Sequence, residues 1–282
     1  MTDGQVAEKT WFITGGSEGL GREWTIAALE RGDCVAVAAR HQGRLAEIAA
    51  AYGERALPIT LDVTDRDAVF AAVAQAHAHF GRLDVIVNNA GYGQYGVVEE
   101  LTQEEARAQL DTNFFGALWV TQASLPFLRN QGSGHILQVS SIGGVTAADG
   151  LGIYHASKWA LEGLSQALAL EVREFGIRVT IVEPTGYRTA AERAARRTAP
   201  NPAYEREHAR MEGRRVQFDR FQGDPVATRS AILQVVDAED PPLRLLLGAG
   251  ALQSVAAEYE KRLAVWRSWE SVSVAAHGYP PD

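Results

Sequence analysis

Short apolar runs alternate with longer amphipathic segments from the start of the chain to about residue 185. The runs WFITGG, CVAVAAR, ALPITLDVT, LDVIVNNAG, GHILQVSS and IRVTIVEPTG have the length and β-branched content of buried strands. The segments around 66–80, 103–130 and 155–175 have apolar spacing typical of helices. Strands that are apolar throughout, separated by helices, indicate a parallel sheet covered on both faces. We therefore predict a single doubly wound α/β domain over residues 1–282.

The segment from about 187 to 225 has a different pattern, with nine arginines and fewer acidic residues. We expect it to form a helical lid over the carboxyl edge of the sheet and call it the lid segment. A helix near 225–238, a strand in LRLLLGA and an amphipathic helix at 251–269 are predicted after it. Residues 271–282 are expected to be a poorly ordered tail.

The composition leaves the predicted fold unchanged and excludes several classes of protein. The net charge of −8 argues against a nucleic-acid-binding or membrane-binding surface, and no apolar run reaches the 18 to 20 residues of a membrane span. The single cysteine, Cys34, excludes a disulfide framework, and the polar start MTDGQVAEKT does not resemble a signal peptide. We therefore expect a cytoplasmic protein. His77 and His79 do not share a helical face, and no metal site is expected.

A glycine-rich stretch, TGGSEGLG over residues 14–21, connects the first predicted strand to the first predicted helix. Glycines allow a tight turn and a close approach of a pyrophosphate, which the free N–H groups of a helix N-terminus can bind. The spacing G-x-x-x-G-x-G departs from the commoner G-x-G-x-x-G, and the alternative is a turn that binds nothing. Its position between strand and helix favours a Rossmann-type dinucleotide site.

The end of the second strand indicates which dinucleotide fits. An acid there would bind the ribose 2′-hydroxyl of NAD, whereas an arginine accommodates the 2′-phosphate of NADP. The chain has Ala39-Arg40 and no acid, so NADP(H) is preferred and NAD(H) is the alternative. Glu18 acts against this preference because an acid in the glycine loop repels a phosphate. Arg40 could also be a solvated residue at the end of the strand.

Further motifs follow in order: NNAG at 88–91 after a strand, Asn113 in a helix, Ser140-Ser141 ending a strand, and YHASK at 154–158. The tyrosine and lysine of YHASK share a helical face, a pairing that is common in helices when taken alone. Together with the glycine loop, these motifs resemble the short-chain dehydrogenase/reductase family in its TGxxxGxG and YxxxK form. The resemblance covers residues 8 to 250 approximately and leans toward the hydroxysteroid dehydrogenase-like or carbonyl reductase-like branch.

The resemblance implies a set of site residues. The catalytic positions are Asn113, Ser141, Tyr154 and Lys158, with Ser141 preferred over Ser140 because the family's serine usually lies about 13 residues before the tyrosine. Thr185 replaces the glycine that usually follows Pro184. The substrate pocket is expected at Gln94, Tyr95, Ser141, Gly143 and Tyr187. The cofactor positions, including those of the glycine loop and the second strand, are Gly15, Ser17, Glu18, Gly19, Leu20, Gly21, Arg40, Asp62, Val63, Asn89, Ala90, Gly91, Tyr154, Lys158, Pro184, Gly186, Tyr187 and Thr189.

These residue types suit the reduction of a ketone, which needs a hydride at carbon and a proton at oxygen. A free tyrosine has a pKa of about 10, and a cation one helical turn away lowers that pKa. Tyr154 would then be the general acid in reduction and the base in oxidation. Ser141 would hydrogen-bond the carbonyl oxygen. The resemblance implies that Lys158 also binds the nicotinamide ribose and that Asn113 steadies a water relay.

We therefore predict an NADPH-dependent oxidoreductase that interconverts a ketone and a secondary alcohol of small-molecule size. One alternative is a 3-oxoacyl thioester reductase, whose anionic substrate the lid arginines could bind. Another is a redox sensor that binds NADPH without turnover, which has no need of all four catalytic residues. Because family members commonly associate through the helices after NNAG and around YxxxK, we expect a homodimer or homotetramer.

Overall fold

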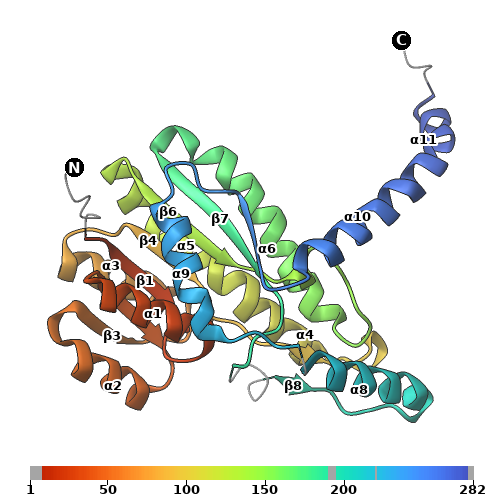
Figure 1. The fold of residues 1–282 in the computed structure, drawn as a ribbon, viewed down its shortest axis with the longest axis horizontal. Coiled ribbons are helices and arrows are strands. Elements are labelled where there is room, and N and C mark those ends of the chain that lie inside the picture. The colour runs from red at the N-terminus through yellow and green to blue at the C-terminus, as the bar shows by residue number, and fades with distance from the viewer. Residues whose placement is uncertain (1–7, 190–194, 220, 279–282) are drawn as a thin grey trace.

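The computed structural model describes residues 8–189, 195–219 and 221–278 (Figure 1). Within them, a seven-stranded parallel sheet has the order β3-β2-β1-β4-β6-β7-β9 and carries helices on both faces. The doubly wound α/β prediction is confirmed. The strands are β1 (Thr10–Thr14), β2 (Cys34–Ala39), β3 (Ala56–Thr60), β4 (Val85–Asn88), β6 (Gly134–Val139), β7 (Ile177–Pro184) and β9 (Arg244–Leu247).

The strands form because most of their side chains are apolar on both faces of the sheet. Ile13 of β1 pairs with Val37 of β2 and Val87 of β4, and all three side chains are buried. Burial on both faces requires helical crossovers between the strands. The helices are α1 (Gly19–Arg31), α2 (Gln42–Tyr52), α3 (Arg66–Phe80), α4 (Gln103–Leu110), α5 (Gly116–Gln131), α6 (Gly152–Glu171), α8 (Glu205–Asp219), α9 (Thr228–Asp237), α10 (Ala251–Ser268) and α11 (Glu270–His277).

The shorter elements connect these helices and strands. A π-helix over Asp111–Phe115 joins α4 to α5, and the strands β5 (Gln94–Tyr95) and β8 (Arg196–Arg197) pair in a small separate sheet. The 3-10 helices are η1 (Gly53–Arg55), η2 (Val98–Glu100), η4 (Ile142–Gly144), η5 (Arg173–Phe175), η6 (Pro202–Tyr204) and η7 (Pro225–Ala227). None of the helices in the described part of the chain is long and apolar enough to cross a membrane.

The hydrophobic core has two layers, one on each face of the sheet. One layer packs α1, α2 and α9 through Trp24, Leu45 and Ile232, and the other packs α3, α5 and α6 through side chains such as Val73 and Val120. The indole Nε1 of Trp24 donates a hydrogen bond of 2.8 Å to Thr228 Oγ1, so this large side chain is buried with its polar atom satisfied. The two layers hold the strand ends in fixed positions.

Two segments lie outside the layers (Figure 1). The lid segment contains β8 and α8, and β8 joins it to β5 beyond the sheet's carboxyl edge. The helices α10 and α11 project away from the body of the domain. The sequence predicts a poorly ordered tail from about residue 271. In the structure the chain continues as α11 to His277, and residues 279–282 lie outside the described part of the chain.

Candidate active site

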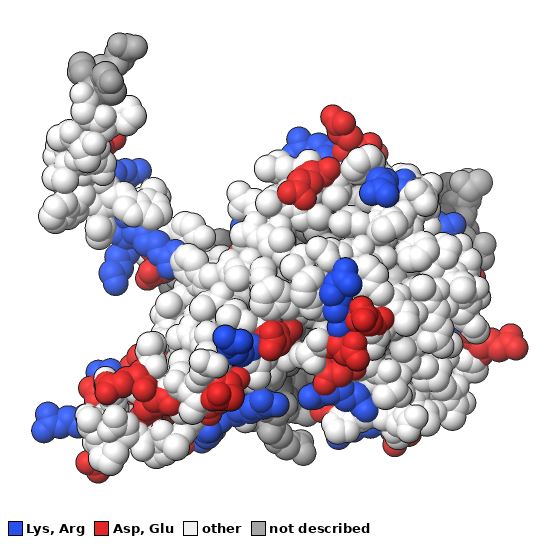
Figure 2. All heavy atoms as spheres, turned by 180° about the vertical axis from the view of Figure 1, so that it is seen from behind, with Lys and Arg blue, Asp and Glu red and all other residues white. Residues whose placement is uncertain are grey.

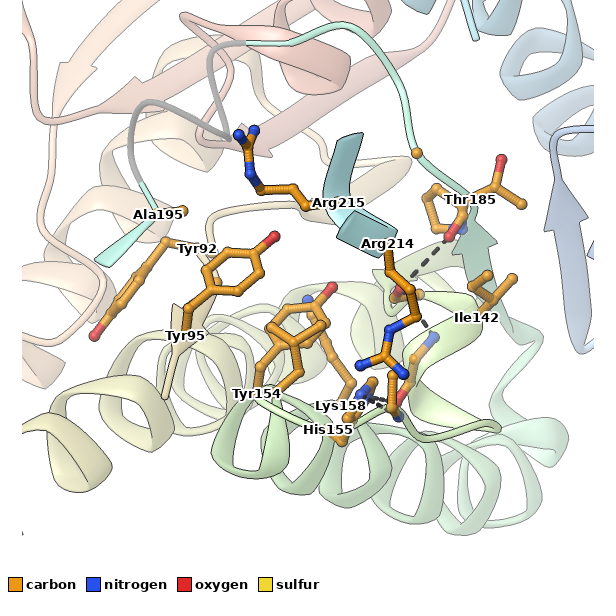
Figure 3. A pocket seen from close by; sticks show the side chains of 18 of the residues that line it. Tyr92, Tyr95, Ile142, Tyr154, His155, Lys158, Thr185, Ala195, Arg214 and Arg215 are labelled. Carbon is orange, nitrogen blue, oxygen red and sulfur yellow. Dashed lines mark hydrogen bonds between the residues drawn. The ribbon is translucent and has the colours of Figure 1, made fainter. Parts of the chain in front are cut away.

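All strands of a parallel sheet end at one edge, and here a cavity of about 1070 Å³ opens at that edge. Its walls come from the first turn of α1, from the loops after β4, β6 and β7, from α6 and from the lid segment. Figure 3 shows Tyr154, His155 and Lys158 on the α6 side of the cavity, with Arg214 and Arg215 of α8 on the opposite side. The topology therefore brings the separated motifs of the sequence to one place.

The glycine loop has the close packing that its composition predicts. Gly15 and Gly19 have φ of 62° and 56°, a left-handed conformation that favours glycine. At Gly21 a Cβ atom would collide with the side-chain amide of Asn89 and lie 2.5 Å from the Gly15 oxygen. Asn89 itself donates to the carbonyl oxygens of Thr14 and Gly15, at 3.0 and 3.2 Å. Asn89 of the NNAG motif thus holds the glycine loop in place through hydrogen bonds, a contact that the sequence pattern does not reveal.

The N-terminus of α1 suits a pyrophosphate. Glu18 is the N-cap residue of α1, but its side chain makes no capping hydrogen bond. The backbone N–H groups of the first turn are therefore not bound by a capping side chain, and the helix dipole adds partial positive charge. Leu20, Asn89, Gly91 and Thr189 line the cavity beside this turn. The residues present fit a dinucleotide.

Two arginines, Arg40 and Arg44, follow β2 along the chain. Arg40 follows β2 and is exposed, and Glu18 forms an ion pair with Arg44 of α2. That ion pair offsets the repulsion expected from Glu18. The sequence analysis did not identify Arg44, because the residue lies beyond the strand end in the next helix. After β3, Asp62 is exposed and accepts hydrogen bonds from Thr64, while Val63 is buried.

Asn113 lies in the π-helix that joins α4 to α5 and is buried there. Its side-chain nitrogen donates to Tyr92 O at 3.0 Å and to Ser157 Oγ at 3.1 Å, and its oxygen accepts from Tyr92 N at 3.1 Å. Asn113 therefore ties the segment after NNAG to the start of α6. π-Helical turns are rare and often mark functional sites.

Tyr154 and Ser141 are close partners. Ser141 Oγ accepts a hydrogen bond of 3.0 Å from Gly143 N, which fixes its rotamer. Burial raises the pKa of the Tyr154 phenol above its usual value, and the hydrogen bond with Ser141 acts in the opposite direction. Ser141 is thus the serine that contacts the tyrosine, whereas Ser140 lies nearer Glu162.

The sequence-based expectation that Lys158 lowers the pKa of Tyr154 is wrong for this arrangement. The pKa of Tyr154 is raised because burial outweighs the other effects. Lys158 Nζ turns toward the end of β6, where it donates to Val139 O at 2.8 Å. Burial also lowers the pKa of Lys158 to about 8, and Glu162 opposes that shift.

The expected substrate residues are only partly brought together. Tyr95, Ser141, Gly143 and Tyr187 line the cavity. Gln94 is absent from the cavity lining: its side chain is buried and donates to Thr198 Oγ1 at 2.9 Å and to Glu105 Oε1 at 3.4 Å. Because side chains alternate along a strand, Gln94 and Tyr95 of β5 face opposite sides. Three of the expected cofactor residues lie at the same edge of the sheet: Ser17 follows β1, Pro184 ends β7 and Gly186 follows β7.

Two acidic residues that the sequence analysis missed hold the lid segment. Asp149 precedes α6 and forms ion pairs with Arg210, at 3.0 Å, and with Arg214. Glu100 accepts hydrogen bonds from Asn201 N at 2.7 Å and contacts His208 Nε2 at 2.6 Å. On the face shown in Figure 2, basic and acidic side chains are intermixed over the domain and no extended patch of one sign appears.

Among the described residues, no group of three or more His, Cys, Asp or Glu side chains could hold a metal ion. This finding covers residues 8–189, 195–219 and 221–278, in which Cys34 is a free thiol with a pKa that burial raises to about 11.

Comparison with known proteins gives consistent matches over the whole domain. The family model described as short chain dehydrogenase matches residues 9–200. Oxidoreductase BOA17 of Botryotinia fuckeliana is 40% identical over 95% of this chain and 99% of its own length. The 3-ketodihydrosphingosine reductase of Bacteroides thetaiotaomicron is 35% identical over 84% of this chain and 87% of its own length. The crystal structure of a short-chain dehydrogenase from Streptomyces avermitilis has a TM-score of 0.89 and 40% identity, with 96% and 98% of the two chains covered.

The substitution Gly21→Ala tests the glycine loop. We expect it to weaken NADPH binding about tenfold or more, because the added methyl must displace the amide of Asn89 and the loop that it clamps. A fluorescence titration of NADPH measures the affinity. Gly43→Ala is the control, because nothing lies within 4 Å of the added carbon there. Equal affinities in the two variants would contradict the proposed fit of the loop.

Proposed function

Because this chain belongs to the short-chain dehydrogenase family and is an NAD(P)-dependent dehydrogenase/reductase acting on CH–OH groups, we propose that it uses NADPH to interconvert a ketone and a secondary alcohol. The observation that carries the proposal is the meeting of Ser141, Tyr154 and Lys158 on one cavity wall beside the glycine loop. A hydride donor, a proton donor and a carbonyl-orienting hydroxyl are the groups that this chemistry requires.

In this proposal Tyr154 is the general acid for reduction. The bound dinucleotide supplies the hydride to the carbonyl carbon. Because burial raises the pKa of Tyr154, the phenol carries its proton at neutral pH and can donate it to the developing alkoxide. Ser141 Oγ accepts from Gly143 N and donates to Pro184 O at 3.4 Å, and in the proposed reaction its hydroxyl would turn to the carbonyl oxygen and orient the substrate.

Lys158, on the same face of α6 as Tyr154, and Asn113 of the π-helix would support that step. Lys158 lines the cavity and provides a positive charge near the ribose of the dinucleotide. Asn113 holds the backbone of Tyr92, so that the segment after β4 keeps its distance from α6. Both residues would stabilise the arrangement in which Tyr154 acts.

The preference for NADPH is supported by the charges around the adenosine side. Arg40 is exposed at the end of β2, where a 2′-phosphate would lie, and no acid stands at that strand end. The ion pair with Arg44 reduces the repulsion from Glu18. The two arginines therefore favour the phosphorylated dinucleotide over NAD(H).

The substrate class that we propose is a hydrophobic ketone. The walls beside Tyr154 include Ile142, Leu151, Tyr187 and Met211, and the cavity is large enough for an extended molecule. A relative named as a 3-ketodihydrosphingosine reductase is consistent with ketone reduction. The ion pairs of Arg210, Arg214 and Arg215 with acidic side chains argue against an anionic thioester substrate.

We also propose a homodimer or homotetramer in the cytoplasm. Along α10 and α11, side chains such as Tyr259, Leu263, Trp266 and Trp269 are at least two-fifths exposed, which favours burial against a second copy. We call the segment formed by α10 and α11 the arm. Arg262 of α10 stacks over Trp159 of α6, so the arm begins beside the helix that carries the YxxxK motif. The free thiol Cys34 suits a reducing compartment.

The substitution Tyr154→Phe tests the role of the phenol. Loss of the proton donor should lower kcat about 10²-fold to 10⁴-fold while NADPH binding is retained. Oxidation of NADPH with a panel of ketones and 3-oxoacyl thioesters measures turnover. Tyr187→Phe is the control, because it removes a phenol from the same cavity.

Each alternative function has its own outcome in that assay. Turnover only with thioesters would favour the thioester reductase, and tight NADPH binding without any turnover would favour the redox sensor. Unchanged turnover in Tyr154→Phe would contradict the general-acid assignment.

The substitution Arg40→Asp tests cofactor selection. Losing a charge-assisted contact and adding a repulsive carboxylate should shift the ratio of NADPH to NADH efficiency by about 10-fold to 100-fold toward NADH. Parallel measurements of kcat/KM with both dinucleotides give the ratio. Arg173→Asp makes the same change of charge on η5, away from the cavity lining, and should leave the ratio as it is. If both variants behave alike, Arg40 does not select the cofactor.

The double substitution Trp266→Glu and Trp269→Glu tests the arm. We expect the molar mass measured by light scattering to fall from a multiple of 30.5 kDa to the mass of one chain, because two buried charges would oppose association. Val226→Glu, at an exposed apolar residue of η7, is the control. A wild-type protein that is monomeric, or a variant that keeps its mass, would contradict the proposal.

A further inference from the structure

The burial of the charged Lys158 is electrostatically unfavourable, and the YHASK motif alone provides no compensating charge. Lys158 is only 5% exposed, and its Nζ donates a hydrogen bond to a neutral carbonyl, Val139 O. A buried ammonium loses hydration, and burial accordingly lowers the pKa of Lys158 to about 8. A lysine in this position needs an anion nearby to stay charged.

The anion on the same helical face is Glu162. It follows Lys158 by four residues on α6, so the two side chains project from the same helical face, and it is equally buried. Glu162 is the charged group that raises the pKa of Lys158 against the effect of burial. The motif YHASK ends before Glu162, which is why the sequence analysis did not single it out.

Glu162 is itself held in place from β9. Its Oε2 lies 3.1 Å from Arg244 Nε, and the same Nε lies 3.3 Å from Oε1 of Glu183 at the end of β7. Gln166 accepts a hydrogen bond of 2.9 Å from Arg244 Nη2. The cluster thus joins α6, β7 and β9 behind the wall of the cavity, with Ser140 as a neutral neighbour of Glu162.

Glu183 is the other carboxylate of this cluster, and it does not have the same relation to Lys158. Burial raises the pKa of Glu183 to about 7, with a further contribution from Glu162. Glu183 therefore carries only part of its charge at neutral pH, and it is not among the groups that act on the pKa of Lys158. Burial also raises the pKa of Glu162, but Ser140, Arg244 and Lys158 oppose that rise. Glu162 is the carboxylate that shares a helical face with Lys158.

We propose that Glu162 is a positioning residue for Lys158, a buried counterion on the same helical face that keeps the ammonium charged at the wall of the cavity. The proposal rests on the function proposed for Lys158, but the charge of Lys158 can be measured without substrate or dinucleotide. Removing the carboxylate leaves a buried ammonium with a carbonyl partner alone, so Lys158 loses its proton at a lower pH.

The experiment follows the titration of Lys158 directly. The chain contains three lysines, at positions 9, 158 and 261. Lys9→Arg together with Lys261→Arg leaves one lysine, whose ¹³C-labelled Cε resonance reports its protonation between pH 5 and 11. In this background, we expect a midpoint near pH 8 with Glu162 and a midpoint lower by about one pH unit or more in Glu162→Gln.

Glu183→Gln is the matched control, because it removes a buried carboxylate from the same cluster and should move the midpoint much less. An unchanged midpoint in Glu162→Gln, or an equal shift in both variants, would overturn the proposal. Should Glu162→Gln fail to fold, Glu162→Asp withdraws the charge by one methylene. A downward shift then supports the proposal and an unchanged midpoint overturns it.

The alkaline limb of kcat/KM distinguishes this proposal from the proposed function. Activity that needs a charged Lys158 falls as the pH rises through its pKa, so the limb should move to lower pH with the resonance midpoint. If the resonance midpoint of Lys158 moves but the alkaline limb of kcat/KM does not, Glu162 is still the counterion, and the proposed role of Lys158 in turnover is refuted.

Discussion

The common direction of the strands is the constraint on which the rest of this structure depends. Parallel strands need crossovers through helices, so their carboxyl ends meet at one edge and their amino ends at the other. The central strands are buried on both faces and carry mostly apolar side chains, with a few buried polar ones such as Gln138 and Thr180. Polar and flexible residues therefore collect where the strands end, and the glycine loop, NNAG, Ser141 and Pro184 become neighbours.

A second consequence is that burial at the sheet edge changes how the charges of the site behave. Tyr154 and Lys158 start α6 against the sheet edge, where burial disfavours the charged form of each. The phenol then keeps its proton, as a donor to an alkoxide should, while the ammonium needs a counterion. Glu162, which Arg244 holds behind the cavity wall, can serve as that counterion without occupying the space of a substrate.

The lid segment is attached by contacts of another kind. Its arginines pair with Asp149 and Glu212 near the surface, and such pairs contribute little free energy each. The buried carboxylate of Glu100 makes the firmer attachment, because it accepts from Asn201 N and contacts His208. Asp149 also precedes α6 by three residues, so the lid and the helix of Tyr154 share one connection.

Local patterns in the sequence were sufficient to predict the seven strands, most of the helices, the glycine turn and the one-turn spacing of Tyr154 and Lys158. Each of these depends on periodicity or turn chemistry within a few residues. Only the tertiary structure decided where Lys158 Nζ points, in which direction the pKa of Tyr154 shifts, and that Gln94 faces the lid. It also paired Glu18 with Arg44 and brought Arg244 to Glu162 across 82 residues. Burial and distant charge pairs arise when helices and strands pack together, so no short stretch of sequence contains them.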